Sequence, residues 1–280
     1  CRFRNEPIRQ LFLSVRFLAG AEDAAALVFD PAVIIRDDGV AVGTAAIDFA
    51  TGDVRFDGYS TCPPLLFVRL LAPGVAARLG HLRPTGSVRL QAGGTLNPRD
   101  FSRNAVTWTF DGREVGVDRW RLDRLSLSGR LSGTSAEIWN LSGAGFGGVF
   151  TGAVDMAAAW SPDRTLERLY VAARGGVEDV SGSALARAFG LPGAERYEGR
   201  LSIAGGVNGA TGPGALQTLR GEGRIRLTAG RLFRVPVFSP LIEFLDRLIP
   251  GADLSSSRTD AAADWTLTDG QVRAESIVVG

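Results

Sequence analysis

Apolar and polar residues alternate with a period of two along most of the chain. In Gly223 to Leu227, Ile225 and Leu227 fall on one face of an extended segment, while Arg224 and Arg226 fall on the other. Such segments are short and end at glycine or aspartate, a pattern typical of antiparallel strands joined by tight turns. The predicted strands are residues 8–18, 31–36, 40–48, 53–59, 86–92, 104–110, 113–118, 167–174, 199–205, 223–229 and 260–268, with a long β stretch over 119–160 and a last strand after Asp269-Gly270.

Strand parity predicts one apolar and one polar face for the sheet. The apolar positions that we assign to the inner face are Val88, Leu90, Leu201, Ile203, Ile225, Leu227, Trp265 and Leu267. Two interpretations of this face stay open. The apolar faces of a β-sandwich pack against each other, whereas an unfilled apolar face forms a groove for the hydrocarbon part of a ligand.

Three segments break the alternation and predict short helices. Residues 65–80 have helical spacing interrupted at Pro73-Gly74, and residues 183–190 begin with a serine cap at Ser183 and stop at Gly190. Residues 239–248 begin at Ser239-Pro240 and end at Pro250-Gly251. Their apolar stripe consists of Leu241, Phe244, Leu245 and Leu248. With one arginine on its polar side, this helix is expected to cover the sheet rather than to lie on a membrane surface.

Glycine is the strongest compositional signal, at 36 residues. We expect turns at Gly39, Gly52, Gly58, Gly86, Gly112, Gly133, Gly152, Gly199, Gly223 and Gly270. The order strand, helix, strand over residues 53–92 returns over residues 167–205, which points to a quasi-repetitive architecture. Together these patterns predict a mostly β protein with an elongated, curved antiparallel sheet and a few short amphipathic helices.

Composition narrows the class of protein. The chain has 280 residues, 45% hydrophobic and 22% charged, with a net charge of +1. It is therefore globular, and the charge leaves no electrostatic footprint for nucleic acid. No run reaches the length of a membrane-spanning helix. Because the chain starts without methionine, we interpret it as a fragment of a longer protein, with a β-rich segment over 1–139 and a second over 140–280.

The sequence contains no constellation of catalytic residues. The chain has a single histidine, His81, and no nucleophile-elbow motif that could form a catalytic triad with it. One histidine and the two distant cysteines, Cys1 and Cys62, are too few ligands for a zinc site. The Asp-Gly pairs, such as Asp111-Gly112, are expected to be hairpin turns rather than paired catalytic carboxylates. We therefore predict no enzyme activity, no cofactor and no metal; an aspartate-dependent hydrolase would require two carboxylates clustered in a pocket.

Several motifs follow one another in the second half of the chain. They are Gly221-Glu222-Gly223 and its strand, Gly230-Arg231-Leu232, Val235-Pro236, the apolar helix ending near Pro250 and the hairpin at Asp269-Gly270. Upstream of them lie the glycine-rich strand from Phe146 to Gly152 and the short helix opened by Asp179-Val180. In this order the motifs resemble the C-terminal region of AsmA-like proteins, and the resemblance covers roughly residues 140–280.

The resemblance implies a periplasmic part of a protein anchored in the inner membrane of a Gram-negative envelope. Such a protein would form a repeating β-groove along which phospholipids move toward the outer membrane, without catalytic residues. Its partners would be phospholipids, the inner membrane through a segment outside this chain, and outer-membrane or other envelope proteins. The alternative is a structural or assembly module of the envelope with a closed β-sandwich core.

Overall fold

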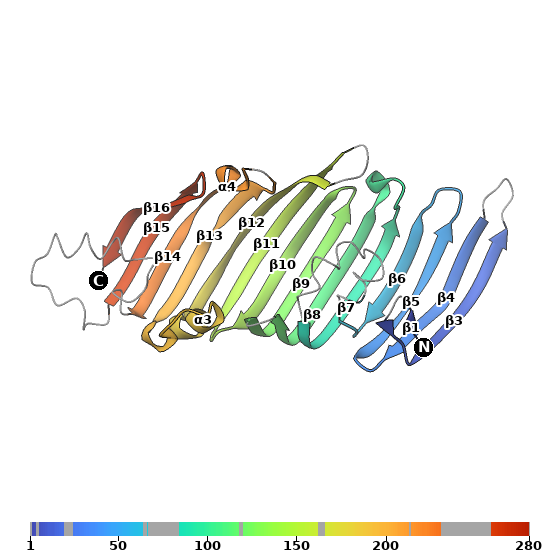
Figure 1. Ribbon diagram of the computed structural model, residues 1–280, viewed down its shortest axis with the longest axis horizontal. Coiled ribbons are helices and arrows are strands. Elements are labelled where there is room, and N and C mark those ends of the chain that lie inside the picture. The colour runs from blue at the N-terminus through green and yellow to red at the C-terminus, as the bar shows by residue number, and fades with distance from the viewer. Residues whose placement is uncertain are drawn as a thin grey trace, which may run out of the picture. The chain divides into compact units, whose positions relative to one another are not determined.

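The structure is a computed structural model and describes residues 2–3, 6–19, 25–63, 66, 84–117, 120–161, 166–212, 214–230 and 259–279. The fold is mostly β, and the expected curved antiparallel sheet with short helices is confirmed (Figure 1). A small two-stranded sheet precedes one large sheet whose strand order is the chain order, so the large sheet contains no crossover.

The strands are long for a globular protein. Their bounds are β1 Arg2–Phe3, β2 Glu6–Pro7, β3 Gln10–Ala19, β4 Ala25–Arg36, β5 Gly39–Asp48, β6 Val54–Ser60, β7 Pro84–Leu96, β8 Ala105–Val117, β9 Trp120–Ser132, β10 Ser135–Gly145, β11 Gly148–Trp160, β12 Leu166–Ser181, β13 Arg200–Ala210, β14 Arg220–Gly230, β15 Thr259–Thr268 and β16 Gln271–Val279. The helices are α3 Gly182–Ala188 and α4 Ala215–Thr218, with the 3-10 turns η1 Phe101–Arg103 and η2 Ala194–Arg196.

The chain divides into two compact units. The first comprises Cys1–Leu141 with Asp155–Ala159, and the second comprises Ser142–Val154 with Trp160–Gly280. Within the first unit, each strand from β3 to β9 pairs antiparallel with the next along the chain. The strands from β12 to β16 do the same within the second unit.

Helix α3 follows β12 directly and matches the predicted helix, shifted by one residue. The serine cap is not Ser183 as predicted but Ser181, whose hydroxyl accepts a hydrogen bond from the Ala184 N–H. The helix does stop at Gly190, which has a positive φ of 69°, and Leu191 N–H closes the end by donating to the Ala186 carbonyl.

The predicted turn at Asp111-Gly112 is wrong. Residues 105–117 form one strand, β8, in which Asp111 pairs with Arg89 on one side and with Ser126 on the other. Gly112 is glycine because a Cβ there would meet the Phe110 ring, at 3.2 Å, and the Val115 side chain. In this position glycine marks crowding within a strand rather than a turn.

Several other glycines predicted as turns also lie inside strands. Gly58, Gly152 and Gly223 are interior positions of β6, β11 and β14, and Gly86 lies at an irregularity in β7. Gly52, Gly133 and Gly270 do lie in connections between strands, as predicted. The glycines that lie inside strands affect how the sheet bends at the candidate site.

In the first unit, a cluster of buried polar residues joins the loop that follows β5 to the loop that follows β7. Asn97 is 1% exposed, donates to the Thr51 carbonyl (3.0 Å) and to the Asp53 carboxylate (2.6 Å), and accepts from the N–H of Arg99. The Arg103 guanidinium binds the second oxygen of Asp53. Because every buried polar group in this cluster has a partner, the loops after β5 and β7 are fixed to each other.

Three sequence predictions fall outside the described residues. They are the helix over 65–80, except for Leu66, the histidine His81, and the helix over 239–248 with Leu241, Phe244, Leu245 and Leu248.

Candidate functional site

One face of the second unit gathers the predicted apolar residues into adjacent rows. The register pairs Leu201 with Leu227 and Ile203 with Ile225, so these four side chains lie on the same side of β13 and β14. On β15, Trp265 lies opposite Gly223, and Leu267 lies opposite Gly221. We call this side the inner face of the second unit, and the side carrying Arg224 and Arg226 its outer face.

A row of glycines crosses this inner face. Gly175, Gly205 and Gly223 are direct neighbours on β12, β13 and β14, and a Cβ on Gly175 would lie 2.9 Å from the Cα of Gly152 on β11. A Cβ on Gly223 would likewise lie 2.9 Å from the Cα of Gly205. Real side chains do not fit at such distances, so the row lets the sheet bend sharply toward its inner face.

The indole of Trp265 covers the end of this row. A Cβ on Gly223 or Gly205 would meet its Cζ2 atom at 2.7 Å or 3.0 Å, so this part of the ring lies against both glycines. A large apolar ring therefore replaces the side chains that the glycines lack. The ring keeps this part of the inner face apolar, because it covers backbone that the glycines would otherwise leave exposed.

The first unit has an inner face of the same construction. Val88 pairs with Gly112, and Leu90 pairs with Phe110, so both predicted residues lie on the face that β8 and β9 continue with Trp108 and Leu127. Its small residues Gly43, Gly58, Ala92 and Gly129 also fall in a row across the strands, with Trp108 between Ala92 and Gly129. The Trp108 ring covers Gly129, whose Cβ would lie 2.5 Å from Cε2.

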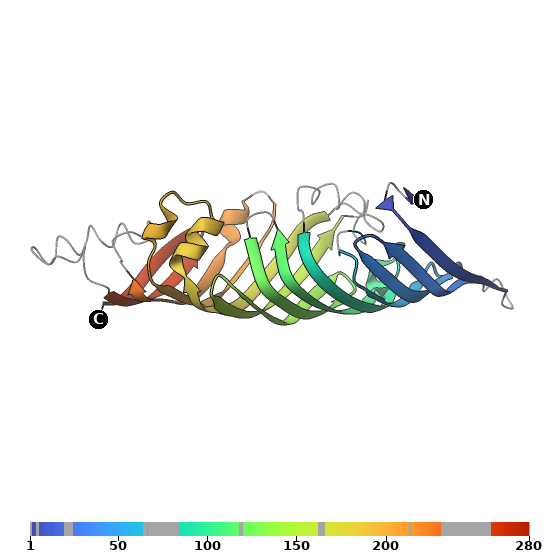
Figure 2. The same cartoon turned by 90° about the horizontal axis from the view of Figure 1, so that it is seen from below.

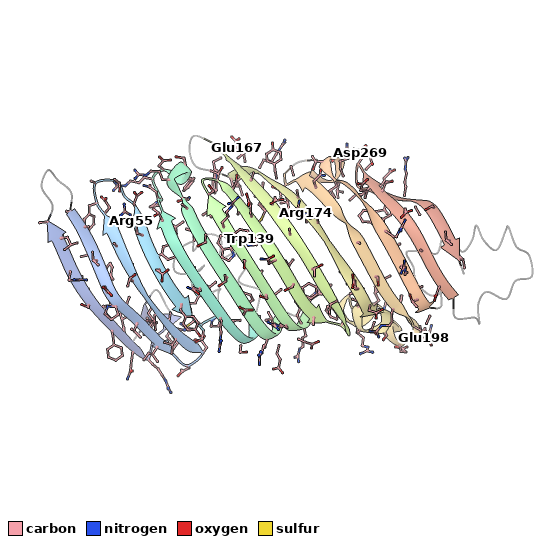
Figure 3. All side chains as sticks on the ribbon, turned by 180° about the vertical axis from the view of Figure 1, so that it is seen from behind. Arg55, Trp139, Glu167, Arg174, Glu198 and Asp269 are labelled. Atoms are coloured by element: carbon pink, nitrogen blue, oxygen red, sulfur yellow. The ribbon has the colours of Figure 1, made fainter. Side chains whose placement is uncertain are left out.

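In each unit the strands bow, so that one side of the sheet is hollow (Figure 2). Helix α3 stands on the hollow side of the second unit, whereas Figure 3 views the opposite side, where Arg174 is labelled. Arg174 pairs with Gly206 on the outer face, so the inner face of this unit is the hollow one. In the first unit the side seen in Figure 3 carries Arg55, which alternates with the inner residues Val54 and Phe56.

The inner faces form a single layer. Most of their large apolar side chains, including Leu90, Ile203, Ile225 and Trp265, are half-buried, and no second large sheet packs on them among the described strands. A β-sandwich of this size would bury such residues almost completely. Val88 and Leu227 are the predicted residues that are fully buried.

Part of the first unit's inner face is covered. Leu66 packs with Cys62 and Ala41, and Ile34 packs against this cluster. Burial raises the pKa of the Cys62 thiol, since the low polarity of the cluster disfavours the thiolate. In this cluster, part of the first unit's inner face has a packed second layer of core type.

The outer face of the second unit is mostly polar over β13, β14 and β15, and ion pairs join these strands. On the second unit, Arg224 binds Asp264 with Nε–Oδ1 at 2.7 Å, and the Ser276 hydroxyl donates to the same carboxylate. The Arg224 hydrogen bond, followed by that of Ser276, holds the pKa of Asp264 below its ordinary value. These contacts join β14, β15 and β16 on the side away from the apolar rows.

Two surface depressions lie beside charged residues of the outer faces. One, of about 1010 Å³, lies in the first unit beside Arg89, Asp111 and Arg113. The other, of about 770 Å³, lies in the second unit beside Arg200 and Arg226. Charged residues mix with the apolar Val88 in the first lining and with Val177 and Ile203 in the second, so neither depression is a purely apolar pocket.

The same alternation of residues along the strands could have identified many more inner-face residues than the eight that we predicted. The structure adds Leu11, Leu13, Val15 and Phe17 on β3, Phe110, Leu125 and Leu127 on β8 and β9, Val171, Val177 and Val180 on β12, and Ala261, Ala263, Ile277 and Val279 on β15 and β16. The glycine rows carried no such signal, since glycine fits both turns and strand interiors.

Within the described part of the chain, no cluster of three or more metal-ligating side chains occurs and no helix is long and apolar enough to span a membrane. No protein-family model, no curated protein and no solved structure matches the chain.

Proposed function

We propose that this chain is a segment of a phospholipid conduit in the periplasm, and that it carries acyl chains on the hollow, apolar inner faces of its sheet. The observation that supports the proposal is the unfilled apolar layer, in which Ile203 and Ile225 remain half-buried in the folded chain. Apolar surface of this extent on a folded protein usually marks a binding surface.

The energetics favour a lipid ligand. Water costs an acyl chain about 0.8 kcal/mol for each CH₂ group, or roughly 12 kcal/mol for a chain of about 16 carbons. An apolar face that shields the acyl chain along its path removes most of this barrier, and no chemical step is required. The outer face of the second unit meanwhile stays compatible with water through pairs such as Arg224 with Asp264.

The cellular setting is part of the proposal and comes from the resemblance to AsmA-like proteins. It comprises anchoring in the inner membrane by a segment outside this chain, and delivery of lipid toward the outer membrane. The curvature of the antiparallel sheet in each unit matches the groove that the resemblance implies and carries no information on the cellular setting.

A second candidate is an envelope assembly module that does not transport lipid. The cluster of Leu66, Cys62, Ala41 and Ile34 favours it, because part of an inner face is already packed there. If this mode of packing extends over the inner faces in solution, the protein has no surface left for acyl chains.

Lipid extraction and mass spectrometry of the purified protein distinguish the two. We expect phospholipid to copurify with the wild type and to be lost from an Ile203→Asp/Ile225→Asp variant, because two carboxylates on the inner face are incompatible with an acyl chain. The matched control is Ala204→Asp/Arg226→Asp, which changes the adjacent outer-face positions.

Circular dichroism establishes that each variant is folded. A wild-type protein free of phospholipid would contradict the conduit and favour the assembly module. Equal lipid content in the inner-face and outer-face variants would also contradict it, since binding would then not depend on the inner face.

A further inference from the structure

Strand β3 is an edge strand with apolar side chains on both faces. It pairs with β4 alone among the described strands. Leu11, Leu13, Val15 and Phe17 lie on its inner face, and Phe17 is 63% exposed. Phe12, on the outer face, is 55% exposed.

This edge lacks the features that usually prevent strands from adding to a sheet. Edge strands are commonly protected by proline, by several charged side chains or by a covering segment. Over its ten residues β3 has no proline, and Arg16 is its one charged residue. Among the described residues, nothing else pairs with the outer edge of β3, so its backbone N–H and C=O groups on that side are available to another strand.

The other edge of the sheet, β16, also carries apolar residues on both faces, together with two charged residues and an irregularity in its pairing. It pairs with β15 alone among the described strands. Its inner-face residues are Val272, Ala274, Ile277 and Val279. Val278 lies on the outer face and is 67% exposed.

We propose that β16 of one molecule pairs antiparallel with β3 of a second copy, so that the inner faces of the two molecules form a longer apolar surface. In one register the apolar positions coincide on both faces. Leu11 lies beside Val279, Phe12 beside Val278, and Leu13 beside Ile277.

The register includes one irregularity, which lies on β16. The pairing of β16 with β15 shifts between Ser276 and Ala274, whereas β3 keeps its period of two because the extra residue of its own pairing lies on β4, between Phe29 and Ala32. Beyond this point Val15 lies beside Ala274, and Phe17 lies beside Val272.

The same register contains one unfavourable pair, Arg16 beside Arg273. Asp30 offsets part of this repulsion through its ion pair with Arg16, at 3.3 Å. The contact joins two different edges, so each dimer retains a free β3 and a free β16. Association of this kind continues into longer oligomers rather than stopping at a dimer.

Analytical ultracentrifugation over a concentration series tests the proposal without reference to lipid, so its failure and the failure of lipid binding are separate results. We expect the wild type to form a ladder of oligomers. Val278→Lys places a charge beside Phe12 and should weaken association by about tenfold or more. Arg273→Glu replaces the repulsion with an attractive pair and should tighten association about two- to tenfold.

Disulfide cross-linking identifies the two edges. In a Cys1→Ser/Cys62→Ala background, Phe12→Cys and Val278→Cys proteins are prepared separately and mixed under oxidation. We expect a cross-linked product in the mixture and none from either protein alone. Thr107→Cys, on the outer face of the interior strand β8, is the control and should not cross-link.

Three outcomes would overturn the proposal. The first is a wild type that stays monomeric at every concentration. The second is association that neither Val278→Lys nor Arg273→Glu changes. The third is a cross-link of Phe12→Cys with itself, which would mean that two β3 edges pair instead.

Discussion

Gly205 and Gly206 are adjacent in β13 and point to opposite faces of the sheet. A Cβ on Gly205 would lie 2.9 Å from the Cα of Gly223 and 3.0 Å from the Trp265 ring. A Cβ on Gly206 would meet nothing closer than the Ala173 carbonyl, at 3.5 Å. Gly205→Ala should therefore destabilise the second unit by about 1–3 kcal/mol, as overpacking does, and lower its urea midpoint.

Gly206→Ala is the matched control, and its stability should stay within about 0.5 kcal/mol of the wild type. The pair Gly175 and Gly176 on β12 repeats the comparison, since a Cβ on Gly176 would meet its nearest atom at 3.4 Å. If all four variants lost the same stability, the glycine row would not be the reason for the bend.

Asp264 should make the stability of the second unit depend on pH. Its pKa in the folded state is lowered by the Arg224 hydrogen bond, then by that of Ser276, so the folded protein holds this proton less tightly than the unfolded chain does. The stabilisation is complete above the ordinary aspartate pKa, and it is lost as the pH falls from about 5 through the folded pKa. Urea unfolding at several pH values measures it.

Asp264→Asn should flatten this acid dependence, and adding Arg224→Gln to Asp264→Asn should flatten it no further, because both changes remove the same ion pair. An Asp264→Asn protein with the acid dependence of the wild type would show that the pair contributes nothing to stability at neutral pH.

For single residues, the sequence predicted on which face of the sheet an apolar side chain lies. It did not predict whether a glycine lies in a turn or inside a strand. Leu201, Ile203, Ile225 and Leu227 share a face as the alternation requires. Gly112 and Gly223 were predicted to be turns, but both lie inside strands. Their role depends on the backbone of a neighbouring strand, which is distant in sequence.

Among the secondary-structure elements, helix α3 allows a direct comparison of two candidate caps. The sequence pointed to Ser183, whereas in the structure the Ser181 hydroxyl accepts from the Ala184 N–H. Ser181→Ala should cost about 1 kcal/mol, as the loss of a helix cap usually does, measured as the shift in thermal midpoint. Ser183→Ala should stay within about 0.5 kcal/mol of the wild type; a larger loss at Ser183 than at Ser181 would reverse the assignment.

The presence of a strand was easier to predict from the sequence than its length. The segments predicted at 40–48 and 260–268 match β5 and β15 to within one residue. The hairpin predicted at Asp111-Gly112 instead proved to be the continuous strand β8, with Glu114 at a positive φ of 52°. An Asp-Gly pair favours a turn locally, but pairing with β7 and β9 along its whole length keeps β8 extended.

For the molecule as a whole, each unit is stabilised mainly by neighbouring strands rather than by a central core. Thirteen apolar residues are buried among those described, and several of these are alanines. Contacts between strands that follow one another along the chain resemble those of repeat proteins, in which stability is a sum over neighbours. The open apolar face is a consequence of this design, since a packed core would have filled it.

The alternation of residues between the inner and outer faces provides the most direct test of the proposed conduit. Photo-cross-linking residues placed singly at Leu201, Ile203, Ile225 and Leu227 lie on the apolar side of β13 and β14, whereas those at Ser202, Ala204, Arg224 and Arg226 lie on the polar side. After exposure of the protein to phospholipid vesicles and irradiation, mass spectrometry measures the lipid attached at each position. We predict adducts that alternate with a period of two along each strand and appear at the inner positions; adducts at both sets alike, or at none, would contradict the central claim that acyl chains bind the inner face.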